Sequence, residues 1–249
     1  MPICRKPRLK RAPLVVLVLL CVGVIACVGT AVFQAARVSG CKAASANGLQ
    51  QIQLAMENYR QANGSYPPQY LADKEGRPAH SWRVLIWPYL CGDDSWRRYR
   101  FDEPWDGPHN KLLASETPVC FRSPNADRQS KSTVTDYVGI VGKGTPWRGT
   151  SPLRMQDMHG RSRKIVWFVE VANSGINWME PRDISLEQAL VGINVAGGIQ
   201  SNYADGLPAQ LMPYGCEFLP VGTPPEAFRA MLTVTGGKDE ASETAPPAR

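Results

Sequence analysis

Residues 14–33 read LVVLVLLCVGVIACVGTAVF, a run of about twenty residues without a charged side chain. A helix of that length crosses the hydrocarbon core of a bilayer, which is about 30 Å thick. Residues 5–11 read RKPRLKR, and positive charges beside a span face the cytoplasm. The sequence therefore predicts a cytoplasmic basic segment over residues 1–11, a transmembrane helix over 12–36 and one extracytoplasmic domain over 37–237.

Three outcomes are open for the apolar segment. An uncleaved signal anchor is favoured, because cleavable signal peptides have shorter apolar regions of about 7–15 residues. Cleavage is the second outcome, and residues 33–36, FQAA, offer the marginal site for it. In the third, residues 24–27, VIAC, act as a lipobox, and a lipidated Cys27 becomes the anchor. The first and third outcomes keep the protein on the membrane.

The net charge of +6 says little about partners, because five of the positive side chains lie in residues 5–11 and orient the span. The rest of the chain is near neutral and has no basic stripe with interleaved aromatic residues. We therefore expect the lipid bilayer as a partner and no nucleic acid. RRYR at residues 97–100 is interpreted as a solvated turn.

Four of the seven cysteines lie on the predicted extracytoplasmic side, where disulfides persist. They are Cys41, Cys91, Cys120 and Cys216. Four cysteines allow three pairings, and the spacing does not choose among them. A zinc site is disfavoured because none of these residues is spaced as C-x2-C.

The helix is predicted to continue beyond the membrane. Apolar or small residues recur every three or four positions from residue 38 to residue 59, and polar residues occupy the other face. The stripe comprises Val38, Cys41, Ala44, Gly48, Leu49, Ile52, Ala55, Met56 and Tyr59. Asn63-Gly64 suits a left-handed C-cap, and Pro67-Pro68 prevents the helix from resuming.

Loops and short helices are predicted over the middle of the chain. Proline and glycine mark residues 66–78 and 101–110 as loops. Residues 81–90, SWRVLIWPYL, form either a short buried helix with Ser81 as its N-cap or a strand. Pro108 is expected in the first turn of a brief helix that runs through Ala114.

Strands are predicted in the second half, where β-branched and aromatic residues cluster between Gly and Pro. The predicted strands are residues 136–141, 164–171 and 215–219. Helices are predicted over residues 185–191, capped by Ser185, and over 224–233, and the polar tail 238–249 is expected to be disordered. The fold class is therefore α+β, a single N-terminal transmembrane helix that continues into a long amphipathic helix packed on an antiparallel β-sheet.

Six segments carry a family resemblance in a constant order. They are VFQAARVSGCKAASANGLQQIQLAMENYRQANGSYPP at 32–68, HSWRVLIWPYL at 80–90, FDEPWDGPHNKLL at 101–113, TDYVGIVG at 135–142, VWFVEVANSGINWMEPRDISLEQAL at 166–190 and LTVTGG at 232–237. The chain resembles the planctomycete-type pilin-like membrane proteins of the domain of unknown function 1559 family over nearly its whole length. The resemblance implies a pilin-type helix packed on a β-sheet domain, export by a membrane signal, and no established activity.

The chain also departs from that family. Members usually carry a prepilin peptidase motif, a glycine followed by Phe-Thr-Leu-Ile-Glu, and a proline in the middle of the helix. Aligned on residues 34–37, this chain has Leu9, Leu14 and Ala31 at the glycine, glutamate and proline positions. The resemblance then implies an uncleaved segment and no pilus polymerisation. Tyr203 stands where the family has a histidine shortly before Asp-Gly.

Recognisable catalytic motifs are missing from the sequence. The histidines His80, His109 and His159 each lack a second ligand at helical or strand spacing, and no nucleophile elbow, Walker loop or dinucleotide fingerprint occurs. We predict a non-enzymatic protein with no assigned catalytic, cofactor-binding or metal-binding residue. A tethered hydrolase that uses Glu170 or Glu180 with His159 is the weaker alternative.

Two acidic groups are considered as sites. Asp102, Glu103 and Asp106 lie in a proline-restrained loop that could hold calcium, although they are expected instead to cap backbone amides and pair with the nearby arginines. The second group is Glu170, Glu180 and Asp183, in and after the strongest predicted strand. A buried Glu170 would be a candidate acid or base, but a salt bridge to Arg182 or another arginine is preferred, and Glu180 is treated likewise.

Seven tryptophans are many for a chain of 249 residues. They are Trp82, Trp87, Trp96, Trp105, Trp147, Trp167 and Trp178. Most are expected in the core, although stacking surfaces of binding modules use the same residue. The first hypothesis is a pilin- or pseudopilin-like structural or interaction component of the cell envelope, with other envelope or pilin-like proteins as partners. The alternative is a membrane-tethered binding module for envelope polysaccharide or peptide.

Overall fold

The computed structural model describes residues 11–90, 94–125, 132–154, 164–213 and 215–234, and side chains from residue 19 onward. Predictions for residues 1–10 of the basic segment 1–11, for Cys91, for His159 and for the tail 238–249 lie outside these residues. The chain divides into two compact units, Met1–Ala43 and Ala44–Arg249. Each unit is described separately below.

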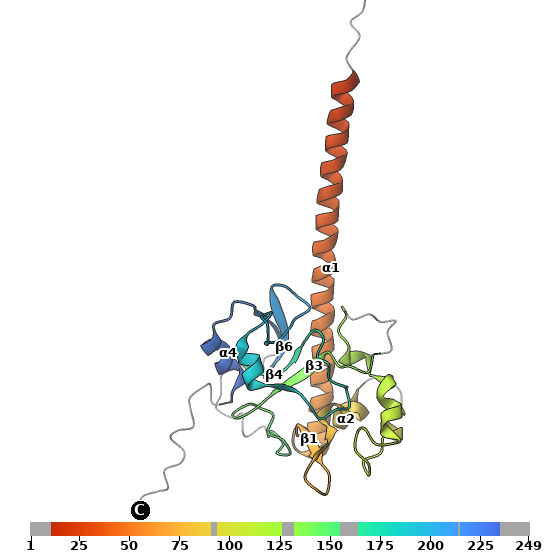
Figure 1. The fold of residues 1–249 in the computed structure, drawn as a ribbon, viewed down its shortest axis with the longest axis vertical. Helices are drawn as coiled ribbons and strands as arrows, with labels where there is room; N and C mark the ends of the chain where they lie inside the picture. The colour runs from red at the N-terminus through yellow and green to blue at the C-terminus, as the bar shows by residue number, and fades with distance from the viewer. Residues whose placement is uncertain (1–10, 91–93, 126–131, 155–163, 214, 235–249) are drawn as a thin grey trace, which may run out of the picture. The chain divides into compact units, whose positions relative to one another are not determined.

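Helix α1, Arg11–Asn63, begins in the first unit (Figure 1). Its apolar side chains are exposed along the first unit, for example Leu19, Ile25 and Phe33, which are 65%, 70% and 67% exposed. Of the helices that the structure describes, one, Leu19–Asn63, is long and apolar enough to cross a membrane. The apolar segment that was predicted to span a membrane is thus helical, and its described side chains are exposed rather than packed in a protein core.

The second unit contains the C-terminal part of α1, whose predicted apolar face is buried. Leu49, Ile52 and Met56 are fully buried, and they pack in a core with residues of the sheet. The predicted end of the helix is confirmed. Gly64 has φ 79°, the left-handed conformation, and its N–H donates to the carbonyl oxygen of Arg60 at 2.8 Å.

Five strands form the sheet, in the order β5-β3-β4-β6-β7. Their bounds are Tyr137–Val141 for β3, Ile165–Glu170 for β4, Ile184–Ser185 for β5, Gly206–Met212 for β6 and Gly215–Pro220 for β7. The β3–β4, β4–β6 and β6–β7 pairs are antiparallel, and β3–β5 is parallel. The α+β prediction and three predicted strands, β3, β4 and β7, are confirmed.

Strands β5 and β6 were not predicted. Pro208 lies inside β6, and proline is disfavoured in a central strand because it has no N–H to donate. The structure accommodates it because β6 pairs with β4 only from Ala209 onward, so Pro208 has β7 alone as a neighbour. Strand β5 is two residues long and leaves no periodic signal.

The region from residue 66 to residue 90 corrects one prediction and decides another. Residues 66–78 were predicted as a loop, but Tyr70–Ala72 (β1) pairs with Pro78–Ser81 (β2) in a separate hairpin. The helical alternative for residues 81–90 is correct. Helix α2 spans Trp82–Ile86, the Ser81 side chain accepts from the N–H of Arg83, and the 3-10 helix η1, Trp87–Tyr89, follows.

Short 3-10 helices fill the next part of the chain. They are η2 (Asp94–Arg98), η3 (Asn110–Glu116) and η4 (Val119–Phe121). The helix predicted from Pro108 to Ala114 therefore starts later and is of the 3-10 type. Its start follows from Glu103, whose carboxylate accepts from the backbone N–H groups of His109 and Asn110 at 3.0 and 2.6 Å.

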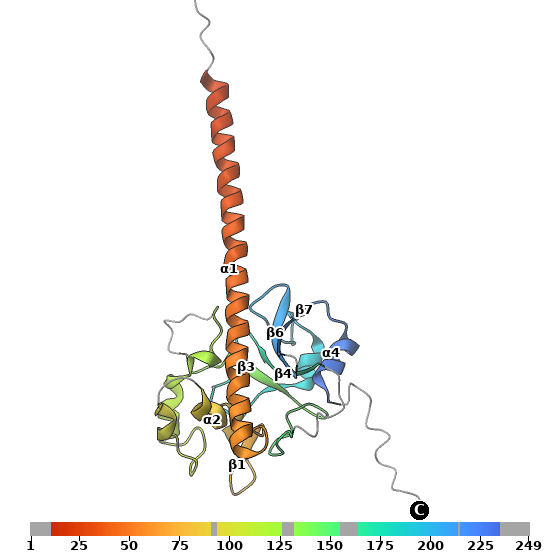
Figure 2. The same ribbon diagram turned by 180° about the vertical axis from the view of Figure 1, so that it is seen from behind.

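The sheet separates two hydrophobic cores. One lies against α1 and contains most of the aromatic residues, and the other contains the aliphatic side chains that pack under α3 (Leu186–Val191) and α4 (Pro225–Leu232). Figure 2 shows the lower part of α1 crossing the strands, with α4 beside β4 and β6. Both helices were predicted, and Ser185 caps α3 through the N–H of Gln188 at 3.1 Å.

Candidate functional site

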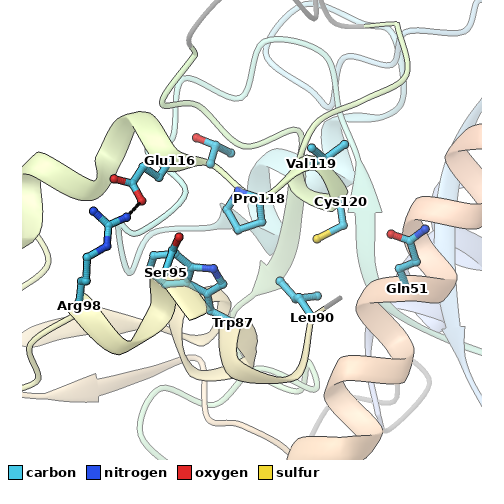
Figure 3. A pocket seen from close by; sticks show the side chains of 10 residues that line it. Gln51, Trp87, Leu90, Ser95, Arg98, Glu116, Pro118, Val119 and Cys120 are labelled. Carbon is cyan, nitrogen blue, oxygen red and sulfur yellow. Dashed lines mark hydrogen bonds and ion pairs between the residues drawn. The ribbon is translucent and has the colours of Figure 1, made fainter. Parts of the chain in front are cut away.

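A pocket of about 530 Å³ lies in the second unit between α1, η1, η2 and η4 (Figure 3). The residues that line it are Gln51, Trp87, Leu90, Ser95, Arg98, Glu116, Thr117, Pro118, Val119 and Cys120. Figure 3 shows Trp87, Leu90 and Pro118 in the middle of the lining, with Arg98 and Glu116 toward one end and Gln51 of α1 toward the other. A ligand with an apolar body and hydrogen-bonding ends fits such a lining.

Trp87 gives the pocket a rigid wall. It is 5% exposed, and its ring meets that of Trp178 edge-on at a centroid distance of 4.7 Å. Arg98 and Glu116 form an ion pair at one end. Val119 stands opposite with 80% of its surface exposed, the highest value among the large hydrophobic residues described. The pocket therefore exposes an aliphatic side chain beside a buried aromatic one.

The other tryptophans do not form a surface groove. Trp82, Trp147, Trp167 and Trp178 are buried in the core beside α1, and Trp96 and Trp105 are half-buried against it. The core prediction is thus confirmed for most of them. Trp87 is the member of the set that lines the described pocket.

Glu170 is buried in β4, which was considered as one possibility, and the preferred prediction of a salt bridge to Arg182 or another arginine is wrong. The carboxylate is 1% exposed and accepts from the hydroxyls of Ser123 at 2.7 Å and Tyr137 at 2.9 Å. Arg182 instead pairs with Glu180 at 2.5 Å, which confirms the interpretation of Glu180. Two neutral donors rather than a cation stabilise the buried Glu170.

A second carboxylate, that of Asp136, lies beside Glu170. The backbone N–H of Ser123 donates to Asp136 Oδ2 at 2.7 Å, so one serine bonds both carboxylates. The pKa of Asp136 is raised to about 6, chiefly by burial and also by the charge of Glu170, while the bond from Ser123 and the Arg122 guanidinium lower it. Sequence analysis missed this pairing because Asp136 and Glu170 are adjacent only through the β3–β4 register.

A buried ion pair between Arg83 and Asp183 was also missed. Both side chains are 0% exposed. Asp183 additionally accepts from the N–H of Gly139 at 2.8 Å and from the indole N–H of Trp82 at 3.2 Å, while Arg83 donates to the carbonyl oxygen of Tyr137 at 2.9 Å. The pair ties α2 to β3 and to the segment before β5. An arginine inside the apolar segment WRVLI is the sequence signal that could have suggested it.

The two described histidines, His80 and His109, each bond a different partner. The Nδ1 atom of His80 lies 2.9 Å from the hydroxyl oxygen of Tyr99, and burial lowers the pKa of His80. The Nε2 atom of His109 lies 2.9 Å from the carbonyl oxygen of Arg98. His159, the third member of the proposed hydrolase set, lies outside the described residues.

The acidic loop and the described cysteines were the other candidates for a metal site or a disulfide. Glu103 caps backbone amides, as expected, but Arg97 pairs with Asp94 and Arg98 with Glu116 rather than with this loop. In the described part of the chain, no three His, Cys, Asp or Glu side chains converge as a metal site. No disulfide joins the described cysteines, Cys21, Cys27, Cys41, Cys120 and Cys216.

Tyr203 occupies the place where the family resemblance expects a histidine. Its hydroxyl group lies 2.8 Å from Ser45 Oγ of α1, and its ring meets that of Phe218 edge-on at 5.0 Å. Tyr203 is 4% exposed. It therefore connects the turn before β6 to the helix.

Comparison with known proteins identifies one family. A family model described as "Protein of unknown function (DUF1559)" matches residues 34–177. No curated protein and no solved structure matches the chain.

Proposed function

The chain belongs to this DUF1559 family of unknown function, and we propose that it is a non-enzymatic, single-pass membrane protein with an extracytoplasmic α+β domain. In this proposal it serves the cell envelope as a pilin- or pseudopilin-like structural or interaction component. The observation that carries it is α1, which combines an apolar N-terminal part with a buried C-terminal face. One continuous helix would thus anchor the domain that it helps to fold.

Burial energetics support an anchoring role for α1. Its large apolar side chains between Leu19 and Phe33 are more than half exposed, and each Leu, Ile, Val or Phe gains roughly 0.3–0.6 kcal/mol on entering the centre of a membrane. The basic residues 5–11 would remain on the cytoplasmic side. The domain that follows would then lie outside the cytoplasm.

Internal hydrogen bonding supports a non-enzymatic role. The buried groups that are candidates for acid–base chemistry, Glu170, Asp183 and His80, are each bonded to protein partners within the core. None of these three lines the described pocket. Their bonds stabilise the fold rather than present a reactive group to solvent.

Cell fractionation tests the anchoring proposal. We expect the chain in the membrane fraction, resistant to carbonate extraction, and its domain degraded when protease is added to intact spheroplasts. The mass of the mature N-terminus then distinguishes a signal anchor from a chain cleaved near residues 33–36 and from a chain lipidated at Cys27. Recovery of the full-length chain in the soluble cytosolic fraction would refute the proposal.

The pocket supports a second candidate function, a tethered binding module for envelope polysaccharide or peptide. Its lining combines an aromatic wall, an exposed aliphatic residue and polar ends, which is a composition that binds small apolar and hydrogen-bonding groups. A tryptophan in the wall also provides a spectroscopic probe.

Titration with envelope glycans and peptides, followed by tryptophan fluorescence, tests this second candidate. Val119→Glu places a charge at the pocket and should weaken any binding at least about tenfold, since a charge resists transfer to an apolar site. Leu112→Glu is the matched control, because Leu112 is also exposed, at 68%, and does not line the pocket. Equal affinity of the two variants would count against the pocket as the site.

A further inference from the structure

Asp136 and Glu170 form a carboxylate pair at adjacent ends of β3 and β4. The strand register sets Tyr137 opposite Glu170, which brings the preceding residue, Asp136, alongside. Ser123 lies between them, donating its N–H to Asp136 and its hydroxyl to Glu170, each at 2.7 Å. Asn202 donates to the Ser123 hydroxyl oxygen at 3.2 Å and fixes it in place.

Other titratable groups of the described chain act on the pair or on its hydrogen-bond partners. Tyr137 from β3 and Cys216 from β7 face Glu170, Cys120 from η4 acts on Tyr137, and the Arg122 guanidinium acts on Asp136. Burial raises the pKa of Cys216 to about 11 and that of Tyr137 well above its ordinary value, so both are neutral at pH 7. Helix α1 contributes Gly48 at this level. The pair therefore places two carboxylates on one serine, with Arg122 acting on Asp136.

The same serine attaches a wall of the pocket to the sheet. Residues 118–120 line the pocket, and Phe121, which follows them, is fully buried. The carbonyl oxygen of Phe121 accepts from the N–H of Asp136 at 2.9 Å. Moving the wall away from the sheet would break the bonds that Ser123 and Phe121 make with Asp136.

We propose that Asp136, Ser123 and Glu170 act as a proton-binding latch, which holds the pocket wall 118–123 on the sheet more firmly in mildly acidic than in neutral solution. One proton on the pair removes the repulsion between the two carboxylates. It also leaves a neutral carboxyl group that tolerates burial better than a charged one.

The direction of the effect follows from proton linkage. The pKa of Asp136 is about 6 in the closed state, against an ordinary value of 3.8 once the wall opens. The closed state therefore binds a proton in the range between those values, where the open state does not. Stabilisation by the latch is complete below the ordinary value and is lost as the pH rises through about 6, which is the reverse of the usual behaviour of a salt-bridged aspartate.

Hydrogen exchange of the full-length chain in detergent micelles tests the latch. Amides in peptides that cover residues 119–125 are followed at pH 5.0 and 7.5, with correction for the intrinsic exchange rates. From the two pKa values of Asp136 we expect protection of these amides to be about tenfold higher at pH 5.0 than at pH 7.5. Asp136→Asn should abolish the difference, and Asp102→Asn, an exposed aspartate of the same domain, should retain it.

Glu170→Gln supplies a second variant in case Asp136→Asn does not fold. It removes the like charge but keeps burial, so the pH difference should shrink without vanishing. A wild-type protection ratio near one would overturn the latch, and so would a ratio in Asp136→Asn equal to that of the wild type. If wild type and Glu170→Gln had the same protection ratio between pH 5.0 and 7.5, Glu170 would have no part in the latch. That result would overturn the paired-carboxylate proposal.

Discussion

Gly48 shows how one residue of α1 sets the distance between helix and sheet. A Cβ atom at position 48 would lie 2.6 Å from the hydroxyl oxygen of Tyr137, closer than real Cβ contacts. Tyr137 cannot move aside easily, because its hydroxyl donates to the buried Glu170. Glycine is therefore required here for close approach rather than for an unusual backbone conformation.

Gly48→Ala should destabilise the protein by about 1–2 kcal/mol. Overpacking costs roughly 1–3 kcal/mol, and the better helix propensity of alanine returns up to about 1 kcal/mol. Gly40→Ala is the control, since nothing lies within 4 Å of a Cβ at that helical position. Chemical unfolding in micelles, followed by near-ultraviolet circular dichroism, measures both; equal midpoints for the two variants would contradict the packing argument.

Arg83 and Arg182 are two arginines of opposite environment. The side chain of Arg83 is 0% exposed and paired with Asp183, whereas that of Arg182 is 53% exposed and paired with Glu180. Arg83→Met leaves the Asp183 carboxylate buried without its cation, which should cost about 3–5 kcal/mol. Arg182→Met should change the free energy of unfolding by less than about 1 kcal/mol. A similar decrease in the free energy of unfolding in the two variants would show that the buried ion pair does not stabilise the fold more than the exposed one.

At the scale of elements, α1 ends where its local sequence directs. Gly64 has φ 79°, and a Cβ atom at this position would have no heavy atom within 4 Å, so Gly64→Ala isolates the conformational cost of a left-handed alanine. We expect a loss of about 1 kcal/mol. Gly222→Ala, at a position with equal space and no left-handed φ, should be nearly neutral. A thermal unfolding midpoint lowered equally by both changes would argue against the cap.

Strand β6 shows that elements also depend on partners that are distant in sequence. Its sequence, GLPAQLM, has a proline and no alternation of polar and apolar residues, yet all seven residues are buried. Two antiparallel neighbours satisfy its backbone from Ala209 onward, and α1 covers one face. Gln210 illustrates this contact, since its side-chain N–H donates to Gln53 of α1 at 2.8 Å.

At the scale of the whole molecule, α1 requires two different environments. The part of α1 in the first unit exposes its apolar side chains. The part of α1 in the second unit buries its apolar side chains against the sheet. The anchoring proposal therefore predicts that charges in the first unit will abolish membrane association without unfolding the domain. Each arginine at the centre of a span costs about 2.5–3.5 kcal/mol.

The double variant Ile25→Arg with Val28→Arg tests that prediction. Both side chains are exposed in the first unit, at 70% and 57%, so the substitution removes no core contact. We expect most of the chain to leave the membrane fraction, while Ile25→Leu with Val28→Leu remains in it. Unchanged membrane association of the arginine variant would contradict anchoring by this helix.

Elements with local signals could be predicted from the sequence alone. The apolar run, the stripe from Leu49 to Met56 and the Asn63-Gly64 cap defined α1, and β-branched runs located β3 and β4. The starts of α2 and α3 could be predicted from Ser81 and Ser185, because an N-cap side chain bonds a backbone amide only two or three residues away. These signals are readable because the interacting groups lie within one helical turn or one strand.

Pairs that join distant segments depend instead on the folded chain. Arg83 and Asp183 are separated by 100 positions, and Ser123 and Glu170 by 47. The partner of a buried charge depends on sheet register and helix packing, which no local pattern encodes. For this reason the sequence allowed for a buried Glu170 but gave no sign of the two hydroxyl groups that stabilise it or of the pocket that η4 lines.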